Sequence, residues 1–463
     1  MLNYLIRLFM FQTLITIKDV YQQAEKLSKS EKLIKVGGWV KSSRESKEKK
    51  FIILNDGSTM NALQIIISRK NFLQLGLLEK INFGSGLLVS GRLVLTPGRQ
   101  QSCELEVEKI ELVNSTDNNY PLQKKNIPLG IVRNFPHLRA KTNYFLAVFR
   151  LRHSISKAIH EFFHQEGFYY APTPIITSGD AEGAGETFTI HAKKEDFFNK
   201  EAKLTVSGQL QAESLAQGLG KVYTFAPCFR AEQSNTTRHL AEFWMVEPEM
   251  AFADLDVITN LAEKMVKWVV NFVLTNNYPE LEHLEKHTQK ELINRLRRLT
   301  KESWEKVDYS KCIEILIKNK ENFILRDIKW GIDLQSEHEK YLCQYFNNKP
   351  IFIINYPQEL KAFYMKNNPD GRTAACFDLI FPQVGELIGG SVREDNYQTL
   401  IGKTQRKKLN LENLSWYLNL RKYGYVPTAG FGLGLERLIM YISGAENIRD
   451  TISFPRYFKH SDF

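Results

Sequence analysis

Five short β-rich runs in the first 115 residues constrain the fold more than any other feature of this sequence. The runs span residues 33–40, 51–54, 63–67, 86–95 and 104–113, with turn-forming residues between them. A helix-like stretch at residues 70–80 falls between the third and fourth runs. Five short strands with a helix at this place are typical of the OB-fold barrel. We therefore predict a five-stranded barrel within residues 17–114.

The same N-terminal quarter holds most of the positive charge. Residues 1–115 carry 17 Lys and Arg against 11 Asp and Glu, which supplies +6 of the formal net charge of +10. Lys and Arg attract phosphate backbones, and barrels of this kind stack bases on aromatic side chains. Trp39 and Phe51 are candidates for stacking, although an aromatic residue on a strand more often belongs to the core. These features favour a nucleic-acid partner.

The character of the chain changes after residue 114. Residues 114–128 are polar and contain prolines, which is typical of a linker, and we predict the linker to span residues 115–136. Residues 143–167 have the amphipathic pattern of a long helix, and residues 168–177 read as an apolar strand.

Further strand runs occur within residues 203–253 and 350–393, whereas residues 255–346 are charged and predicted to form a helical insertion. We therefore predict an α+β chain. Its second domain, residues 137–463, consists of an antiparallel sheet flanked by helices.

Cysteine usage and hydropathy indicate the compartment. The five cysteines never form a C-x-x-C pair, so we expect buried thiols in a reducing compartment: Cys103, Cys228, Cys312, Cys343 and Cys376. No uninterrupted apolar run reaches the roughly 18 residues of a membrane span. Residues 1–17 lack a secretory cleavage site, which leaves organelle targeting as an alternative to the cytoplasmic location that we expect.

One motif points to a metalloprotease. His160, Glu161 and His164 form H-E-x-x-H on the predicted helix, a pattern that can hold zinc. Tyr170 stands where a third histidine would complete the extended motif, and nothing else in the chain serves proteolysis. We therefore expect half-exposed histidines on a helix rather than a zinc site.

A richer group of charged residues lies between Tyr223 and Phe252. This segment reads as two strands around a polar loop, and it brings together Arg230, Glu232, Arg238, His239, Glu247 and Glu249. Strand alternation predicts that Arg230 and Glu232 share one face, where a guanidinium can clamp phosphate oxygens and a carboxylate can accept from an adenine amine. Each residue alone could be part of a surface ion pair, but six together indicate a binding site.

The segment from Gly430 to Arg437 reads GFGLGLER. We interpret it as a glycine-rich turn that leads into an apolar helix at residues 438–442. Small residues let a flat base approach the backbone, and an arginine in the first helical turn can reach a terminal phosphate. The pattern is neither a Walker loop nor a dinucleotide fingerprint.

Together these motifs resemble those of the class II aminoacyl-tRNA synthetases. FRAE…RHLAEF is similar to motif 2, GFGLGLER to motif 3, and the helix and strand ending at Pro174 to motif 1. The N-terminal barrel is typical of the aspartate, asparagine and lysine subgroup. Longer segments resemble the bacterial-type asparagine enzymes, namely AEGAGETF (181–188), VSGQLQAE (206–213), RHLAEFWMVEPEMAF (238–252), WGIDLQSEHEKYL (330–342), NYPQELKAFYM (355–365) and GELIGGSVRE (385–394).

The resemblance implies ligation of asparagine to tRNA(Asn) through an adenylate, with ATP and Mg²⁺ as cofactors. It implies that Arg230 and Arg437 act in catalysis, and that Arg230, Glu232, His239, Phe243, Glu386 and Arg437 bind ATP. Phe243 is expected to stack on adenine. Asp378 and Glu386 are expected to hold Mg²⁺, with a stretch between them that is one residue longer than in aspartyl relatives.

An asparagine side chain offers one acceptor and one donor, so its pocket needs a cation and an acceptor. The resemblance assigns Arg393 to the carbonyl oxygen and Glu247 to the amide NH₂, with Glu182, Ser207 and Gln209 around the α-amino end. Aspartate would place its carboxylate against Glu247, which is a like-charge contact that rejects it.

For tRNA, the resemblance assigns Arg44, Phe51 and Gln64 on the barrel to the anticodon bases. It also implies a homodimer built in part on the helix that carries His160. Three alternatives remain open: an aspartate-specific enzyme, a relative that makes asparagine or an adenylate without charging tRNA, and a nucleic-acid-binding protein without ligase activity.

Overall fold

A computed structural model describes residues 14–30, 32–68, 80–99, 101–122, 127–179, 186–191 and 197–462. The chain divides into two compact units, Met1–Ala147 and Val148–Phe463. This division falls inside a helix, so the boundaries at 114/115 and 136/137 stay a prediction. The helix predicted at residues 70–80 lies almost wholly outside the described residues.

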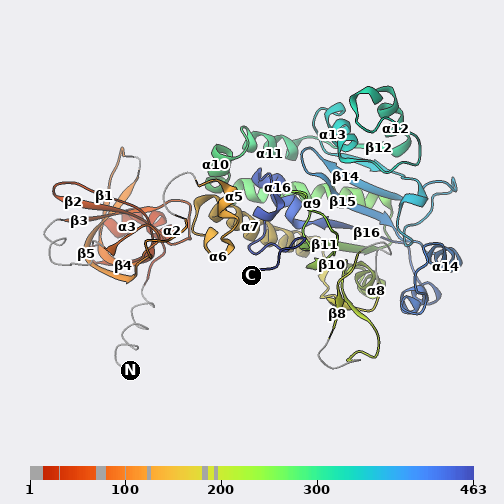
Figure 1. Ribbon diagram of the computed structural model, residues 1–463, viewed down its shortest axis with the longest axis horizontal. Coiled ribbons are helices and arrows are strands. Elements are labelled where there is room, and N and C mark those ends of the chain that lie inside the picture. The colour runs from red at the N-terminus through yellow and green to blue at the C-terminus, as the bar shows by residue number, and fades with distance from the viewer. Residues whose placement is uncertain are drawn as a thin grey trace. The chain divides into compact units, whose positions relative to one another are not determined.

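The first unit contains the predicted barrel (Figure 1). Its elements are α2 (Ile17–Gln22), α3 (Ala24–Ser28), β1 (Ile34–Glu45), β2 (Lys49–Asn55), β3 (Leu63–Ser68), β4 (Gly86–Leu95), β5 (Cys103–Asn114), α5 (Leu129–Val132) and α6 (Pro136–Arg139). The strands close in the order β1-β2-β3-β5-β4. All five strand runs of the sequence therefore form strands, and the predicted barrel is confirmed.

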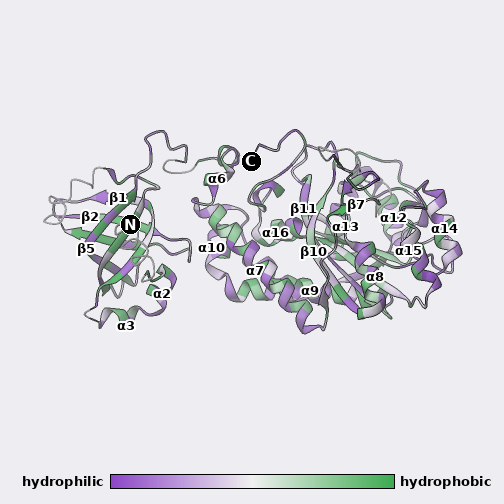
Figure 2. Ribbon diagram, turned by 90° about the horizontal axis from the view of Figure 1, so that it is seen from below, coloured by the Kyte–Doolittle hydropathy of each residue, from purple (hydrophilic) through white to green (hydrophobic). Residues whose placement is uncertain are grey.

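Alternation along the strands builds the barrel core. On β2, Ile52 and Leu54 are fully buried, whereas Phe51 and Ile53 are only partly buried on the outer face. Figure 2 shows this alternation of hydrophobic and hydrophilic residues on the barrel strands. The outer face of β2 is thus free to carry binding residues.

The second unit is built on an eight-stranded sheet in the order β12-β13-β14-β15-β16-β11-β10-β6. These strands are β6 (Tyr169–Tyr170), β10 (Lys221–Phe229), β11 (Glu242–Ala251), β12 (Glu305–Asp308), β13 (Ile351–Ile354), β14 (Cys376–Phe381), β15 (Gly385–Val392) and β16 (Thr428–Gly434). The five pairings from β13 to β10 are antiparallel, but β12 and β6 join the two edges in parallel. The sheet is therefore mixed rather than purely antiparallel as predicted. A small separate sheet contains β7 (Ile176–Thr177), β8 (Thr189–Ile190) and β9 (Ala202–Leu204).

The helices are α7 (Asn143–Gln165), which begins in the first unit, α8 (Gln209–Leu219), α9 (Leu255–Asn276), α10 (Tyr278–His287), α11 (Leu292–Lys301), α12 (Tyr309–Lys318), α13 (Ser336–Tyr345), α14 (Tyr397–Arg406), α15 (Ser415–Asn419) and α16 (Leu435–Ser443). Helix α9 shows why these segments are helical. The Asp254 side chain caps its first turn by accepting from the Val257 N–H. Apolar residues then recur at helical spacing, and this face packs against β14, β15 and β16.

Two of the predicted elements differ from the structure. The insertion at 255–346 is mainly helical, but it also supplies β12 at the sheet edge. Residues 168–177 form two separate two-residue strands, because the prolines at 172 and 174 interrupt the pairing. Among the described residues, no helix is both long and apolar enough to cross a membrane. All five cysteines are buried and free.

Candidate active site

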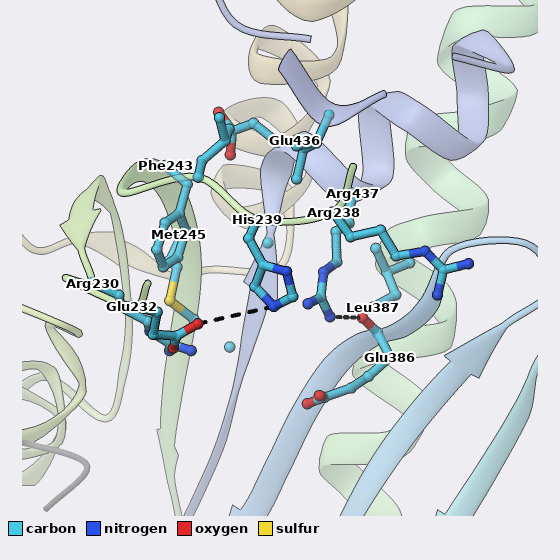
Figure 3. Close-up of a pocket in the computed structure, with 14 residues that line it drawn as sticks. Arg230, Glu232, Arg238, His239, Phe243, Met245, Glu386, Leu387, Glu436 and Arg437 are labelled. Atoms are coloured by element: carbon cyan, nitrogen blue, oxygen red, sulfur yellow. Dashed lines mark hydrogen bonds and ion pairs between the residues drawn. The ribbon is translucent and has the colours of Figure 1, made fainter. Parts of the chain in front are cut away.

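A pocket opens on the sheet where β11, β15 and β16 meet the loop after β10 and the start of α16 (Figure 3). Its lining is Arg230, Glu232, Arg238, His239, Leu240, Phe243, Met245, Glu386, Leu387, Gly432, Gly434, Glu436, Arg437 and Ile448. All six residues predicted to bind ATP therefore lie together.

Two neighbouring strands form the floor of this pocket. On β11, Phe243, Met245 and Glu247 alternate onto one face. On β16 the same face carries Gly430, Gly432 and Gly434, and a Cβ at Gly430 would clash with the Glu249 carboxylate. The segment 430–437 was predicted as a glycine-rich turn before a helix. Instead, residues 430–434 belong to strand β16, whose glycines make room above the sheet, and α16 begins directly at Leu435.

The two residues expected to share a strand face lie elsewhere. Strand β10 ends at Phe229, so Arg230 and Glu232 belong to the loop that joins β10 to β11. The pairing of β10 with β11 ends at Phe229, before the polar residues that follow it, and so earlier than the alternation of the sequence suggested. The loop still brings both into the pocket: the Arg230 guanidinium carbon lies 5.3 Å from the centroid of the Phe243 ring.

His239 lies in the pocket between Glu232 and Arg437 (Figure 3). Burial lowers the pKa of His239, and three nearby arginines lower it further, although Glu232, 3.9 Å from its ring, acts in the opposite direction. His239 is therefore neutral at pH 7 and can donate a hydrogen bond from one ring nitrogen. Arg437 donates to the backbone oxygen of Glu386.

The two carboxylates predicted to hold Mg²⁺ converge above Gly389. A Cβ there would lie 2.8 Å from Glu386 Oε1 and 3.7 Å from Asp378 Oδ1. Asp378 pairs with Gly389, and a register shift leaves Leu387 as an extra residue of β15 between Glu386 and Ile388. Glu386 lies three residues before Gly389, so in a regular strand its side chain would point to the face opposite that of Asp378. The extra residue brings the Glu386 side chain back to the face of Asp378.

The environment of this pair suits a divalent cation. Burial and the nearby Asp378 charge raise the pKa of Glu386. Lys361 Nζ lies 2.6 Å from Asp378 Oδ2, which leaves Oδ1 to face Glu386. The described residues contain no group of three metal-binding side chains. Two carboxylates with further oxygens from a substrate phosphate are a donor set that Mg²⁺ accepts.

Sequence reasoning missed two residues of this region. Glu339 on α13 has its pKa raised to about 7 by burial and then by the charges of Glu386 and Asp378. Lys361 directly follows a 3₁₀ helix (Gln358–Leu360) in the long segment that joins β13 to β14. Both lie in segments quoted for the resemblance, but no spacing within the sequence links them to the pocket.

A second group of residues is the one that the sequence predicts to bind the amino acid, and we call it the candidate amino-acid subsite. Glu247 is fully buried and accepts hydrogen bonds from Ser207 Oγ and, at 2.9 Å, from the Gly208 N–H. Burial raises the pKa of Glu247, while these donors and two arginines oppose that effect. The Gln209 amide nitrogen is buried without a hydrogen-bond partner among the described residues.

Arg393 is held beside this subsite by Glu249. Its guanidinium forms a two-pronged ion pair with that carboxylate, and Arg393 Nη1 donates to Ser391 Oγ at 2.8 Å. The pair keeps the pKa of Arg393 above its usual value. Glu182, the remaining predicted residue of the group, lies outside the described residues.

The predicted anticodon residues occupy neighbouring strands of the barrel. Arg44 pairs with Phe51 across β1 and β2, and its guanidinium carbon lies 4.8 Å from the Phe51 ring centroid. Gln64 on β3 is buried and donates to Glu104 Oε1 at 2.6 Å. Arg44 and Phe51 are therefore accessible, whereas Gln64 is already engaged.

The H-E-x-x-H histidines do not converge on a metal site within the described chain. His160 Nδ1 lies 2.8 Å from the Tyr223 hydroxyl, and its ring packs against Tyr170 and Phe225. His164 is exposed.

Comparisons with known proteins agree with this geometry. Residues 131–457 match the family described as tRNA synthetases class II (D, K and N). The chain is 46% identical to the asparagine–tRNA ligase of Mycoplasma mycoides over 95% of this chain and 98% of that protein. It is 44% identical to the asparagine–tRNA ligase of Alkaliphilus oremlandii, over 97% and 99%. The structure of Pyrococcus horikoshii asparaginyl-tRNA synthetase complexed with asparaginyl-adenylate superposes with a TM-score of 0.83 at 29% identity, covering 92% of this chain and 95% of that one. The chain belongs to the class II tRNA synthetases and, within them, to the asparagine–tRNA ligase family.

Proposed function

We propose that this enzyme attaches L-asparagine to tRNA(Asn) in two steps. An oxygen of the asparagine α-carboxylate attacks the α-phosphorus of ATP, the α–β phosphoanhydride bond breaks, and pyrophosphate leaves. The 3′-terminal ribose hydroxyl of tRNA(Asn) then attacks the adenylate carbonyl and releases AMP. The observation that carries this proposal is the convergence of Arg230, Phe243 and Arg437 on one pocket.

The pocket residues bind and align ATP rather than react with it. Phe243 stacks on the adenine, and Glu232 accepts from the adenine amine. Arg230 lies over Phe243 at 5.3 Å, where its guanidinium can neutralise the α-phosphate. His239 and Arg437 hold the outer phosphates and stabilise the charge that develops on the pyrophosphate.

Asp378 and Glu386 are the residues that would hold Mg²⁺. Bound there, the ion would neutralise phosphate charge. Lys361 fixes Asp378 through Oδ2, so the carboxylate presents its other oxygen toward Glu386. The chain thus positions both carboxylates before substrate arrives.

Selectivity for asparagine arises from Glu247 and Arg393. Ser207 and Gly208 hold the Glu247 carboxylate in place, where it accepts from the substrate amide NH₂. Glu249 orients Arg393, which donates to the substrate carbonyl oxygen. Gln209, with Ser207 and Glu182, serves the α-amino end, where the Gln209 side-chain oxygen accepts from the ammonium group. The unpartnered Gln209 Nε2 is a donor and can serve the substrate carboxylate.

The barrel receives the anticodon, with Phe51 stacking on a base beside Arg44. Gln64 reads a base edge once the base competes with Glu104 for its amide. The enzyme works as a cytoplasmic homodimer, and the exposed Tyr169 and Phe252 are apolar surface of the kind that a subunit interface covers.

Charging of tRNA(Asn) with radiolabelled asparagine tests the proposal. We expect asparaginyl-tRNA to form with ATP, and we expect Arg230→Ala to lower kcat/KM by roughly 100-fold or more because a phosphate contact is lost. Arg326→Ala, at an exposed ion pair with Glu321, is the matched control and should keep full activity. Absence of charging by the unmodified enzyme would refute the proposal.

A further inference from the structure

A second cavity, of about 560 Å³, lies beside the candidate ATP pocket. It is formed by α11, α13 and the turn between β14 and β15. Four cationic side chains line it, namely Arg238, Arg295, Arg298 and Lys340, and no described lining residue is Asp or Glu. Glu339 lies near Gly385 at its edge but outside the lining.

None of these four cations forms a close ion pair with a described carboxylate, although the charge of Glu339 acts on Arg238. Arg295 donates only to neutral oxygens, those of Gln289, Gln383 and the Tyr441 backbone, and its Nε is buried without a partner. Four positive side chains around one cavity, with Glu339 acting on Arg238 alone, favour an anion.

Arg238 connects this cavity to the ATP pocket, because it lines both. Its Nη2 donates to the backbone oxygen of Gln383 at 2.8 Å, which anchors it on the β14–β15 turn. Figure 3 shows its side chain extending away from His239, past Leu387. An anion that leaves the part of the ATP pocket assigned to the outer phosphates can therefore pass to the second cavity while in contact with Arg238.

We propose that this cavity is a second site for inorganic pyrophosphate, which takes up the product as it leaves the ATP pocket. The inference rests on the proposed function, because adenylate formation releases pyrophosphate on the side of His239 and Arg437. A small anion with several negative charges matches four cations, and Gln344 and Asn348 supply neutral donors. A phosphate of bound RNA could also be attracted to these cations. It would not, however, account for Arg238 lining both this cavity and the ATP pocket.

Equilibrium dialysis with labelled pyrophosphate tests the site directly. The ATP pocket is first saturated with α,β-methylene-ATP, without asparagine or tRNA. We expect the unmodified enzyme to bind one equivalent of pyrophosphate per chain under these conditions. Arg298→Ala with Lys340→Ala should weaken this binding at least about tenfold, since two charge-assisted contacts are lost. Both side chains are exposed, so the fold should tolerate the change.

The matched control is Arg297→Ala, which removes an exposed arginine one residue away on α11 that does not line the cavity. It should bind pyrophosphate like the unmodified enzyme. Three results would overturn the inference: no pyrophosphate bound beside the nucleotide analogue, equal binding by the double variant, or loss of tRNA affinity alone. ATP–pyrophosphate exchange with asparagine, measured on the same proteins, reports separately whether the proposed ligase function holds.

Discussion

At the scale of single residues, we expect the choice of asparagine over aspartate to depend on the charge of Glu247. This carboxylate is buried and fixed by Ser207 and Gly208, so it cannot move away from a second carboxylate. We expect Glu247→Gln to raise the relative kcat/KM for aspartate in ATP–pyrophosphate exchange by roughly tenfold or more, because the like-charge contact disappears. An unchanged preference for asparagine would contradict the assignment.

Glu386 is the residue on which we expect the metal requirement to depend. Chelation of Mg²⁺ should abolish exchange, and Glu386→Gln should raise the half-saturating Mg²⁺ concentration by about tenfold because one anionic ligand is lost. Mn²⁺ binding in the presence of ATP, followed by electron paramagnetic resonance, checks the ligand without relying on turnover. Glu446→Gln, at an exposed position, is the control. Equal Mn²⁺ affinity in all three proteins would exclude Glu386 as a ligand.

The residues of the ATP pocket were predictable because most belong to two short segments, 230–243 and 430–437. Their grouping in one pocket is confirmed, although their roles stay predictions. Glu339 and Lys361 were not predictable in this way, since only tertiary packing brings α13 and the segment after β13 to the carboxylates. The partnership of Arg393 with Glu249 was missed for the same reason, because 144 residues separate them.

At the scale of elements, the register shift on β15 decides whether two carboxylates meet. Gly389 leaves the space into which both project, so Gly389→Ala should push them apart. We expect weaker Mn²⁺ binding and exchange lowered by roughly tenfold or more, with the melting temperature changed little. Gly402→Ala on α14, where an added Cβ meets nothing within 4 Å, is the control. Normal Mn²⁺ binding by Gly389→Ala would contradict the arrangement.

The elements of the barrel were easier to predict than those of the second unit. Barrel strands are bounded by turn residues and are rich in apolar residues, so the local sequence alone predicts strands such as residues 33–40 and 63–67. Strand β12 has four residues inside a charged helical region, and only its pairing with β13 makes it a strand. The end of β10 at Phe229 was likewise not predictable from alternation, because it is set by the loop that carries Arg230.

At the scale of the whole molecule, the barrel and the catalytic unit should be separable in function. Phe51 lies on the outer face of β2, far in sequence from every residue assigned to ATP. We expect Phe51→Ala to raise the KM for tRNA(Asn) by roughly tenfold, as the loss of one stacked base predicts. ATP–pyrophosphate exchange should stay unchanged. Equal losses in both assays would show that the substitution damages the fold instead.

The most direct test of the whole account is ATP–pyrophosphate exchange with asparagine and aspartate in parallel, each with and without tRNA(Asn). The account predicts exchange that depends on asparagine and is not supported by aspartate. Exchange with aspartate would contradict the proposed role of Glu247, and no exchange with either amino acid would contradict the proposed ligase activity itself.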